Sequence, residues 1–476
     1  MFDLIVRNAK AIAADWTGPC DVAVQGDKIA SIEPPGVIQD HGHREIDAAG
    51  RLLFPGGVDV HCHYNLDNWG RFRTEGQDFS IAAAFGGTTT IIDFAVQDPG
   101  QTLGAAIAAK RQEADGRTAV DYGLHVILTG DPSFETIEEI GDVINAGVPT
   151  IKTVTTYGWM CDDGHRWGVM TEVAKHGGMS LIHAEDDAIA RWLTKKAVRE
   201  GRVNGAYISE TRNSLVEEAA IRRVMLLAER SGGALYVLHM AAGAGVEALA
   251  EGRAKGLPFY GETLTPYLSF TSEDLWDERS VRVGEREYPQ RGLLLNNFPT
   301  IKSRADRDVL WTALADDRLQ VVSSDHAAIN VRNRYEKQGT TVEAMQAGQA
   351  GVELRLPVLF HLGVAAGKLS LQRFVQLVAT NPARLMGLYP AKGALAVGSD
   401  ADLVIFDPDQ TWTVAVDKLH MSVEYNCWEG WEVRGKVVTT ILRGSVLLED
   451  GTLRGPTNRG KYLPRRLDRE VVEGRA

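Results

Sequence analysis

The middle of the chain alternates between short apolar, β-branched runs and longer stretches with apolar residues at helical spacing. Residues 213–230 and 242–255 have this helical spacing, and eight short runs read as strands: residues 58–63, 88–95, 122–128, 150–157, 180–185, 235–241, 259–264 and 319–327. Eight strands alternating with helices are typical of a (β/α)8 barrel. An open, doubly wound sheet is the alternative, but no Gly-rich phosphate loop follows the first strand to support it.

Both ends of the chain have a different pattern, made of short strands separated by turns. Near the N-terminus the strand-like runs are residues 4–7, 21–24 and 28–32, and near the C-terminus they are residues 401–406, 437–442 and 445–448. We therefore predict an α/β TIM barrel of residues 55–388 with a small β-sandwich domain built from both termini, residues 1–54 plus 389–476. The alternative is two unrelated tails.

Composition excludes several kinds of partner. The 476 residues contain 51 Lys and Arg against 63 Asp and Glu, a formal net charge of −12. This balance disfavours nucleic acid, whose phosphates need clustered cations, and equally an anionic membrane surface. The N-terminus lacks the pattern of a signal peptide, and the apolar windows are shorter than a membrane span requires. We expect a cytoplasmic protein.

The cysteines support the same expectation. The four cysteines are widely scattered and form no C-x-x-C pair: Cys20, Cys62, Cys161 and Cys427. This spacing predicts neither a disulfide framework nor a cysteine zinc site. Reduced thiols are the simplest interpretation.

Metal-ligating residues stand where several of the predicted strands end. His61 and His63 close the first strand on the same face, and further candidates close the fifth, sixth and eighth strands: His183, His239 and Asp325. The carboxyl ends of barrel strands converge, so four imidazoles and a carboxylate would meet at one point. A single histidine at a strand end is more often an ordinary hydrogen-bonded residue, but the joint pattern favours a metal site. Ligands of these types suit Zn2+, with Mn2+, Fe2+ or Co2+ possible.

Lys152 lies in a strand that should point into the closed barrel. A buried ammonium group beside a divalent cation is unfavourable, both through desolvation and through like-charge repulsion. The amine could become neutral through a lowered pKa, or could react with carbon dioxide to give a carbamate whose two oxygens bridge two metals. A lysine that extends to solvent is the third possibility.

The order His61-x-His63, Lys152, His183, His239, Asp325 resembles the amidohydrolase superfamily, in particular its binuclear cyclic amidases. Residues 82–94 look like the second-strand region of hydantoinases and dihydropyrimidinases. Residues 393–402 and 429–437 resemble the same group where its chain returns to the small sheet domain. The resemblance covers almost the whole chain.

The resemblance implies two Zn2+ ions bridged by an N6-carboxylated Lys152. One ion would be completed by His61, His63 and Asp325, and the other by His183 and His239. A hydroxide shared by the two metals would attack the amide carbon, and Asp325 would pass its proton to the leaving nitrogen. The family commonly forms tetramers, so we expect a homo-oligomer, a dimer or homotetramer, with a small cyclic amide as its substrate.

Four positions bear on the ring that is opened. The family places a tyrosine that stabilises the oxyanion where Tyr157 stands. Dihydroorotases carry an arginine where this chain has Asn65, which disfavours that activity and leaves an allantoinase open. Asn296 and Asn297 stand where hydantoinases commonly carry Ser-Pro-Pro-Leu-Arg, and residues 346–350 replace Pro-Asn-Gly-Gly-Pro. We therefore expect a hydantoin- or dihydropyrimidine-like substrate that differs from the simplest parent rings, bound by Tyr157, Asn65, Asn296 and Asn297.

Aromatic residues follow the first and fourth predicted strands. Trp69 and Trp159 could shape an apolar pocket for a ring substituent, or could equally be subunit contacts. A non-catalytic scaffold protein of the same fold is the remote alternative function. Such relatives usually lack several metal ligands, whereas all six are present in this chain.

Overall fold

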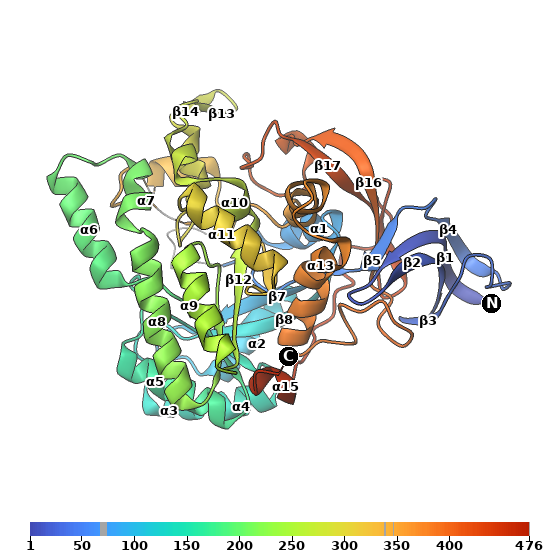
Figure 1. Cartoon of the computed structure of the whole chain (residues 1–476), viewed down its shortest axis with the longest axis horizontal. Helices are drawn as coiled ribbons and strands as arrows, with labels where there is room; N and C mark the ends of the chain where they lie inside the picture. The colour runs from blue at the N-terminus through green and yellow to red at the C-terminus, as the bar shows by residue number, and fades with distance from the viewer. Residues whose placement is uncertain (67–73, 338, 346, 476) are drawn as a thin grey trace.

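The computed structural model describes residues 1–66, 74–337, 339–345 and 347–475. Trp69 and Gln346, which belong to the segments considered above, lie outside the described residues. Figure 1 shows a large body of strands and helices, with a smaller group of strands at the end that holds the N-terminus.

Eight parallel strands form the sheet of the large body, and neighbouring strands follow one another in sequence. They are β6 (Gly57–Asp59), β7 (Thr88–Val96), β8 (Asp121–Ile127), β9 (Thr150–Val154), β10 (Met179–His183), β11 (Ala234–Val237), β12 (Phe259–Leu264) and β15 (Val321–Ser323). The predicted (β/α)8 barrel is confirmed. The first and last strands are shorter than their apolar runs, because the chain leaves the sheet before His61 and before Asp325.

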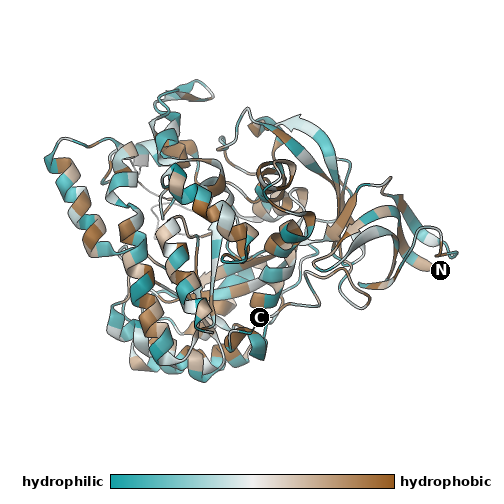
Figure 2. Ribbon diagram, viewed as in Figure 1, coloured by the Kyte–Doolittle hydropathy of each residue, from teal (hydrophilic) through white to brown (hydrophobic). Residues whose placement is uncertain are grey.

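Helices connect the strands and cover the outside of the barrel. The longer ones are α1 (Gln77–Phe85), α2 (Leu103–Ala114), α5 (Asp163–Lys175), α6 (Asp187–Arg199), α8 (Ser214–Ser231), α9 (Gly243–Ala254) and α11 (Arg304–Ala315). The shorter ones are α3 (Phe134–Glu138), α4 (Ile140–Asn145), α7 (Ile208–Thr211), α10 (Thr265–Ser269), α12 (Arg355–Leu359), α13 (Leu371–Val375), α14 (Asn381–Leu385) and α15 (Arg469–Val472). Apolar and hydrophilic residues alternate along α8 and α9 (Figure 2), as expected for helices that bury one face against the barrel.

Side chains and loops close the barrel between its first and last strands. The buried Arg355 guanidinium donates from Nη1 to the Val58 carbonyl of β6 and to the Val322 carbonyl of β15, at 3.1 and 3.0 Å. Just beyond the strands, the His63 N–H donates to the His326 carbonyl at 2.8 Å. The seam of the barrel, by which we mean this β6–β15 junction, therefore lies directly below His61, His63 and Asp325.

The smaller group of strands is one nine-stranded sheet drawn from both ends of the chain. It contains β1 (Phe2–Ile12), β2 (Thr17–Gln25), β3 (Lys28–Glu33), β4 (Gly42–Asp47), β5 (Leu52–Pro55), β16 (Leu403–Thr413), β17 (Glu432–Leu442), β18 (Ser445–Glu449) and β19 (Thr452–Leu453). β5 and β16 pair antiparallel and join the two ends, as Figure 1 shows. A further hairpin, β13 (Val281–Val283) and β14 (Arg286–Tyr288), stands apart from both sheets.

The sheet folds over on itself around an apolar core. The turn between β17 and β18 reaches the β2–β3 hairpin, since a Cβ placed on Gly444 would lie 2.9 Å from Val24 Cγ1. Three other strands lie between β17 and β2 in the sheet order, so only a folded sheet brings them together. The packing is that of the expected sandwich.

A buried network of charges joins the two parts of the molecule. The Lys392 ammonium lies 2.6 Å from Asp121 at the start of β8, 2.9 Å from Asp400 and 2.7 Å from Asp402. After β19 the chain returns to the barrel, where the Leu463 N–H donates to the Tyr122 carbonyl at 2.7 Å. The exact boundaries, residues 54/55 and 388/389, stay predictions.

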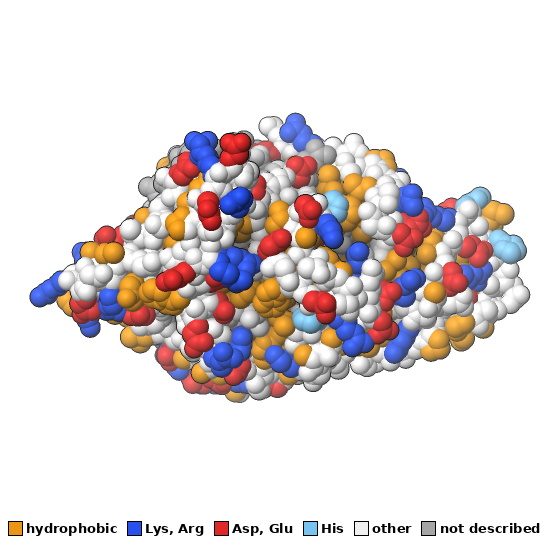
Figure 3. All heavy atoms as spheres, turned by 90° about the horizontal axis from the view of Figure 1, so that it is seen from above, with side chains coloured by type: hydrophobic (Ala, Val, Ile, Leu, Met, Phe, Trp, Pro, Cys, Tyr) orange, Lys and Arg blue, Asp and Glu red, His pale blue; other side chains and the backbone are white. Residues whose placement is uncertain are grey.

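The surface charge and the character of the helices concern two classes of partner, nucleic acids and membranes. On the face seen in Figure 3, acidic and basic side chains are intermixed without a continuous basic surface. Within the described ranges, none of the helices combines the length and the apolar character that crossing a membrane requires.

Candidate metal centre and substrate cavity

The six residues predicted as metal ligands all lie at the carboxyl ends of barrel strands. His61 and His63 follow β6, and Lys152 lies within β9. His183 is the last residue of β10, while His239 and Asp325 each stand two residues beyond the end of β11 and of β15. All six side chains are buried.

Two groups of donor atoms form within this set. In the first, Asp325 Oδ1 lies 3.2 Å from His61 Nε2 and 3.3 Å from His63 Nε2, a spacing that could hold a metal ion. In the second, His183 Nδ1 lies 3.0 Å from His239 Nε2. The rings of His61 and His239 are 5.1 Å apart, so the two groups are adjacent.

Buried carboxylates orient two of the histidines from behind. Glu262 Oε1 lies 2.5 Å from His61 Nδ1, and Glu185 Oε2 lies 2.9 Å from His183 Nε2. Such contacts keep the proton on the outer ring nitrogen and leave the inner nitrogen, His61 Nε2 or His183 Nδ1, free to ligate. Glu262 belongs to the predicted seventh strand, but no sequence pattern marked it as a site residue.

Burial determines the protonation of these groups. It lowers the pKa of His61 and His239 well below the usual histidine value, and it also lowers the pKa of His183. Burial works against ionised Asp325, but the electrostatic interaction with the facing His61 ring and the hydrogen bond from His63 hold its pKa well below the usual range. Neutral imidazoles and an ionised carboxylate are the forms that bind a divalent cation.

Lys152 lies beside the first group of donors. Its Nζ is 3.3 Å from His61 Nε2 and 4.3 Å from the centre of the Phe94 ring. Burial lowers the pKa of Lys152 to about 8, because the charged form loses its hydration. Phe94, which also stacks on His63 at 5.0 Å, was not identified from the sequence.

The donor atoms fit a divalent metal of the zinc class. Imidazole nitrogens and a carboxylate oxygen converge without thiolate in the cluster. The outer nitrogens of His61 and His183 contact buried carboxylates, and burial favours the neutral form of His61, His183 and His239 by lowering the pKa of each. These are the properties of protein sites for such ions.

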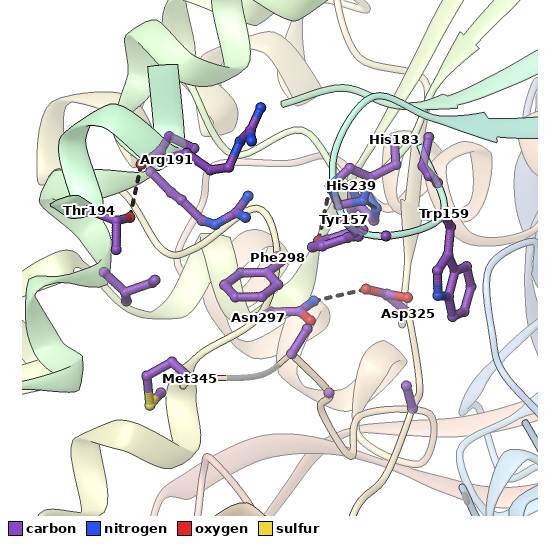
Figure 4. Close-up of a pocket in the computed structure, with 18 of the residues that line it drawn as sticks. Tyr157, Trp159, His183, Arg191, Thr194, His239, Asn297, Phe298, Asp325 and Met345 are labelled. Atoms are coloured by element: carbon purple, nitrogen blue, oxygen red, sulfur yellow. Dashed lines mark hydrogen bonds between the residues drawn. The ribbon is translucent and has the colours of Figure 1, made fainter. Parts of the chain in front are cut away.

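A cavity of about 920 Å³ opens onto these residues, and Figure 4 shows part of its lining. Tyr157 Oη lies 3.1 Å from His183 Nε2, and the Asn297 amide donates to Asp325 Oδ2 at 2.8 Å. Phe298 faces Tyr157 with ring centres 5.7 Å apart. The cavity therefore presents a hydroxyl, an amide and an aromatic face next to the donor atoms.

Arg212 lines the cavity next to Phe298. It stacks 4.4 Å from the Phe298 ring and pairs with Glu185 at 2.9 Å. Burial opposes the ionised form of Glu185, but Arg212 and the contact with His183 lower its pKa to about 2. No spacing rule pointed to Arg212, since it lies in the segment between α7 and α8.

The other predicted substrate-binding residues lie elsewhere. Asn296 is fully buried, and its carbonyl accepts a hydrogen bond from Arg334 at 3.1 Å. Asn65 is half-buried, and its N–H donates to the Glu75 carbonyl at 2.8 Å. Neither belongs to the cavity lining among the described residues, whereas Trp159 does. Their roles in binding stay predictions.

The sequence and the fold match those of known proteins along most of the chain. The family profile described as "Amidohydrolase family" matches residues 52–447, which is most of the chain. The chain belongs to the amidohydrolase family. The resemblance stated from its motifs is thereby confirmed, and the His/Asp cluster above is a candidate metal site of this metal-dependent family.

Individual members of the family cover nearly the full length. The D-hydantoinase of Ralstonia pickettii is 35% identical over 98% of this chain and 99% of its own length. The D-hydantoinase of Geobacillus stearothermophilus is 33% identical over 97% and 96% of the two chains.

Solved structures agree with these relatives. A D-hydantoinase structure superimposes with a TM-score of 0.91 at 34% identity, over 98% of this chain and 99% of that one. The L-hydantoinase (dihydropyrimidinase) from Arthrobacter aurescens gives 0.89 at 29% identity, over 98% and 100%. The likeness extends across the barrel and the composite sheet.

Proposed function

We propose that this chain is a metal-dependent hydrolase that opens the ring of a cyclic amide or imide of the hydantoin or dihydropyrimidine type. The observation that carries the proposal is the meeting of two groups of imidazole and carboxylate donors at the mouth of the barrel, next to a cavity. The names of the relatives, D-hydantoinase and dihydropyrimidinase, support the same reaction class.

The residues present would hold two ions. His61, His63 and Asp325 would bind one, and His183 and His239 the other, with Lys152 bridging them as an N6-carbamate. The lowered pKa of Lys152, about 8, supports this, because only the neutral amine reacts with carbon dioxide. We infer zinc as the native ion, with manganese, cobalt or iron as substitutes.

Such ions lower the pKa of a bound water and polarise the amide carbonyl. The surrounding residues transfer the proton and stabilise the oxyanion. Asp325 accepts the proton of the attacking water and delivers it to the leaving ring nitrogen, while Asn297 fixes its other oxygen. Burial holds the pKa of Tyr157 well above its usual value, so its hydroxyl stays protonated and donates to the oxyanion that forms at the carbonyl.

Turnover of a panel of rings tests the proposal. The metal-loaded protein is incubated with hydantoin, dihydrouracil, their substituted forms, allantoin and cyclic imides. The masses of the products are measured by mass spectrometry. We expect a product heavier by one water from a substituted ring, and loss of this product after chelation with recovery on adding zinc and bicarbonate. A loaded protein that opens none of these rings would contradict the proposal.

We also propose that the chain acts as a cytoplasmic homo-oligomer, a dimer or tetramer. The four cysteines are free and buried, which suits a reducing compartment. Helices α5 and α6 both contact α8, and the three helices carry large exposed apolar side chains, including Trp167 at 48% and Trp192 at 67% exposure. Apolar aromatic surface of this kind is typical of protein interfaces, and light scattering of the purified protein would give the assembly mass.

A further inference from the structure

One wall of the cavity is formed by helix α6 and carries two cations. Arg191, Thr194 and Lys195 all line the cavity, and their spacing places them on one face of the helix. Figure 4 shows Arg191 and Thr194 on the opposite side of the pocket from Asp325 and Trp159. A substrate held at the metal centre therefore has this wall facing it.

The charges on this wall do not cancel. Arg191 pairs with Asp187 at 2.6 Å, on the same helix. Lys195 forms no ion pair within the part of the chain that the structure describes. The side chains of Asp187, Arg191 and Lys195 together therefore carry one net positive charge. Arg212 adds none, because Glu185 neutralises it at 2.9 Å.

The space between the metal centre and this wall is larger than a single ring requires and is partly apolar. At about 920 Å³ the cavity is near the upper end of ligand cavities, roughly 300–1,000 Å³. Ile208, Phe298 and Met345 contribute apolar surface to it. A ring with a substituent uses this space, and an apolar segment of that substituent would lie against these three side chains.

We propose that the preferred substrates are ring amides whose substituent has an apolar segment and ends in a carboxylate, which Lys195 and Arg191 bind. This deepens, and rests on, the ring-opening function proposed above. Among the described residues that line the cavity, the only anionic one besides the metal ligand Asp325 is Glu343, which belongs to residues 339–345 and not to α6. A substituent ending in an ammonium group would instead be drawn toward Glu343.

The test compares rings that are identical except for the end of the substituent: carboxylate, carboxamide or ammonium. The wild-type protein should show a kcat/KM for the carboxylate up to about fivefold above that for the carboxamide, since this is the upper value for a solvent-accessible ion pair. This ratio should fall as salt is raised, because salt screens exposed charges.

Variants assign the preference to α6. In the double variant Arg191→Gln with Lys195→Gln the carboxylate-to-carboxamide ratio should approach unity, and Lys195→Glu should reverse it toward the ammonium. Lys196→Gln is the matched control, since Lys196 is the next residue of the helix but does not line the cavity and lies 4.0 Å from Glu200. Thermal unfolding of each variant confirms that it is folded.

Two results would overturn the inference: a wild-type ratio near unity, or a ratio that the double variant keeps. The unsubstituted and carboxamide rings distinguish these results from failure of the ring-opening function. If only the carboxylate preference is wrong, these two rings are still opened, whereas they also stay intact if the protein opens no rings at all. In that event, calorimetric binding of the same carboxylate and carboxamide rings to the metal-loaded protein decides the inference. Equal affinities would refute it, and a tighter carboxylate complex that the double variant loses would support it.

Discussion

Three residues of the candidate site have a backbone conformation that non-glycine residues seldom adopt. The φ angles of Tyr157, His239 and Asp325 are 69°, 37° and 44°. Such conformations persist only where the surrounding packing enforces them, and they cluster at functional sites. Here each occurs where the chain turns out of its strand, so the side chain faces the cavity or the metal donors.

The proposed metal-bridging role of Lys152 gives a prediction at this scale. Lys152→Ala should lose bound metal and activity together, because the two groups of donors then lack a common ligand. Metal content by mass spectrometry and turnover of a ring substrate are the measurements. Lys175→Ala, at an exposed position on α5, is the control and should keep both. A Lys152→Ala protein with two ions per chain would refute the bridging role.

The contact between Asn297 and Asp325 gives a second prediction. Asn297→Ala should lower kcat about tenfold, the equivalent of one hydrogen bond to a charged group, because Asp325 loses the partner of its Oδ2. Metal content should not change, since Oδ1 still faces His61 and His63. Asn297→Asp should cost more, because it places a second negative charge beside Asp325. Equal kcat values for wild type and Asn297→Ala would exclude the positioning role.

The site could be predicted from sequence to the extent that it depends on strand ends. His183 ends β10 as expected, because a largely apolar run followed by a polar residue marks where a barrel strand leaves the core. Glu262, Phe94 and Arg212 could not be found in this way. Their roles depend on which side chains face each other across the barrel, and a single strand pattern does not contain that information.

Among the elements, helix α9 depends on its neighbours for its N-terminal cap. Its N-cap residue, Ala242, has no side chain that can accept a hydrogen bond. The Ala241 and Ala242 N–H groups donate to Glu217 of α8 at 2.8 and 3.0 Å, and the Gly243 N–H donates to Asp306 of α11 at 2.9 Å. These contacts satisfy backbone groups that would otherwise be left without partners.

The buried position of Glu217 predicts a pH dependence of stability. Burial raises its pKa to about 7, above the unfolded value of 4.5, so between these values the folded protein binds more protons than the unfolded one. The free energy of unfolding should therefore fall as pH rises from 4.5 to 7, by on the order of 3 kcal/mol from this group. Denaturant unfolding at several pH values measures it.

Glu217→Gln keeps the acceptor for the Ala241 N–H but removes the titration, so the contribution of this group to the pH dependence should disappear. Glu218→Gln, at the next position of α8 and only partly buried, should leave it in place. An unchanged pH profile in Glu217→Gln would contradict the assignment.

Two helices were predicted to within one residue of their observed bounds, whereas the end of the first strand was not. Residues 213–230 and 242–255 correspond to α8 (Ser214–Ser231) and α9 (Gly243–Ala254). The first strand ends at Asp59 although its apolar run continues to residue 63. The pattern reports burial, which persists beyond Asp59, whereas the hydrogen-bond ladder ends where the backbone turns to direct His61 and His63 inward.

At the scale of the whole molecule, Lys392 holds three carboxylates between the barrel and the composite sheet. Lys392→Met should lower the free energy of unfolding by about 3–5 kcal/mol, because Asp402 is left buried without its cation and Asp121 keeps only the Arg443 cation. Lys28 is a matched control, since it pairs with Asp400 at 2.6 Å but is half exposed. Lys28→Met should cost no more than about 1 kcal/mol. Equal losses in the two variants, measured by denaturant unfolding, would refute this role.

The pairing of both chain ends has a consequence for synthesis on the ribosome. Chains emerge N-terminus first and domains generally fold as they appear, but β5 must wait for β16 and β6 must wait for β15 and Arg355. Neither sheet is complete until most of the chain has left the exit tunnel, so the first-made strands carry unpaired edges throughout elongation. Capture of an ion by the candidate ligands His61, His63 and Asp325 would accordingly be a late event, and the nascent chain is the form of this protein that most needs protection from aggregation.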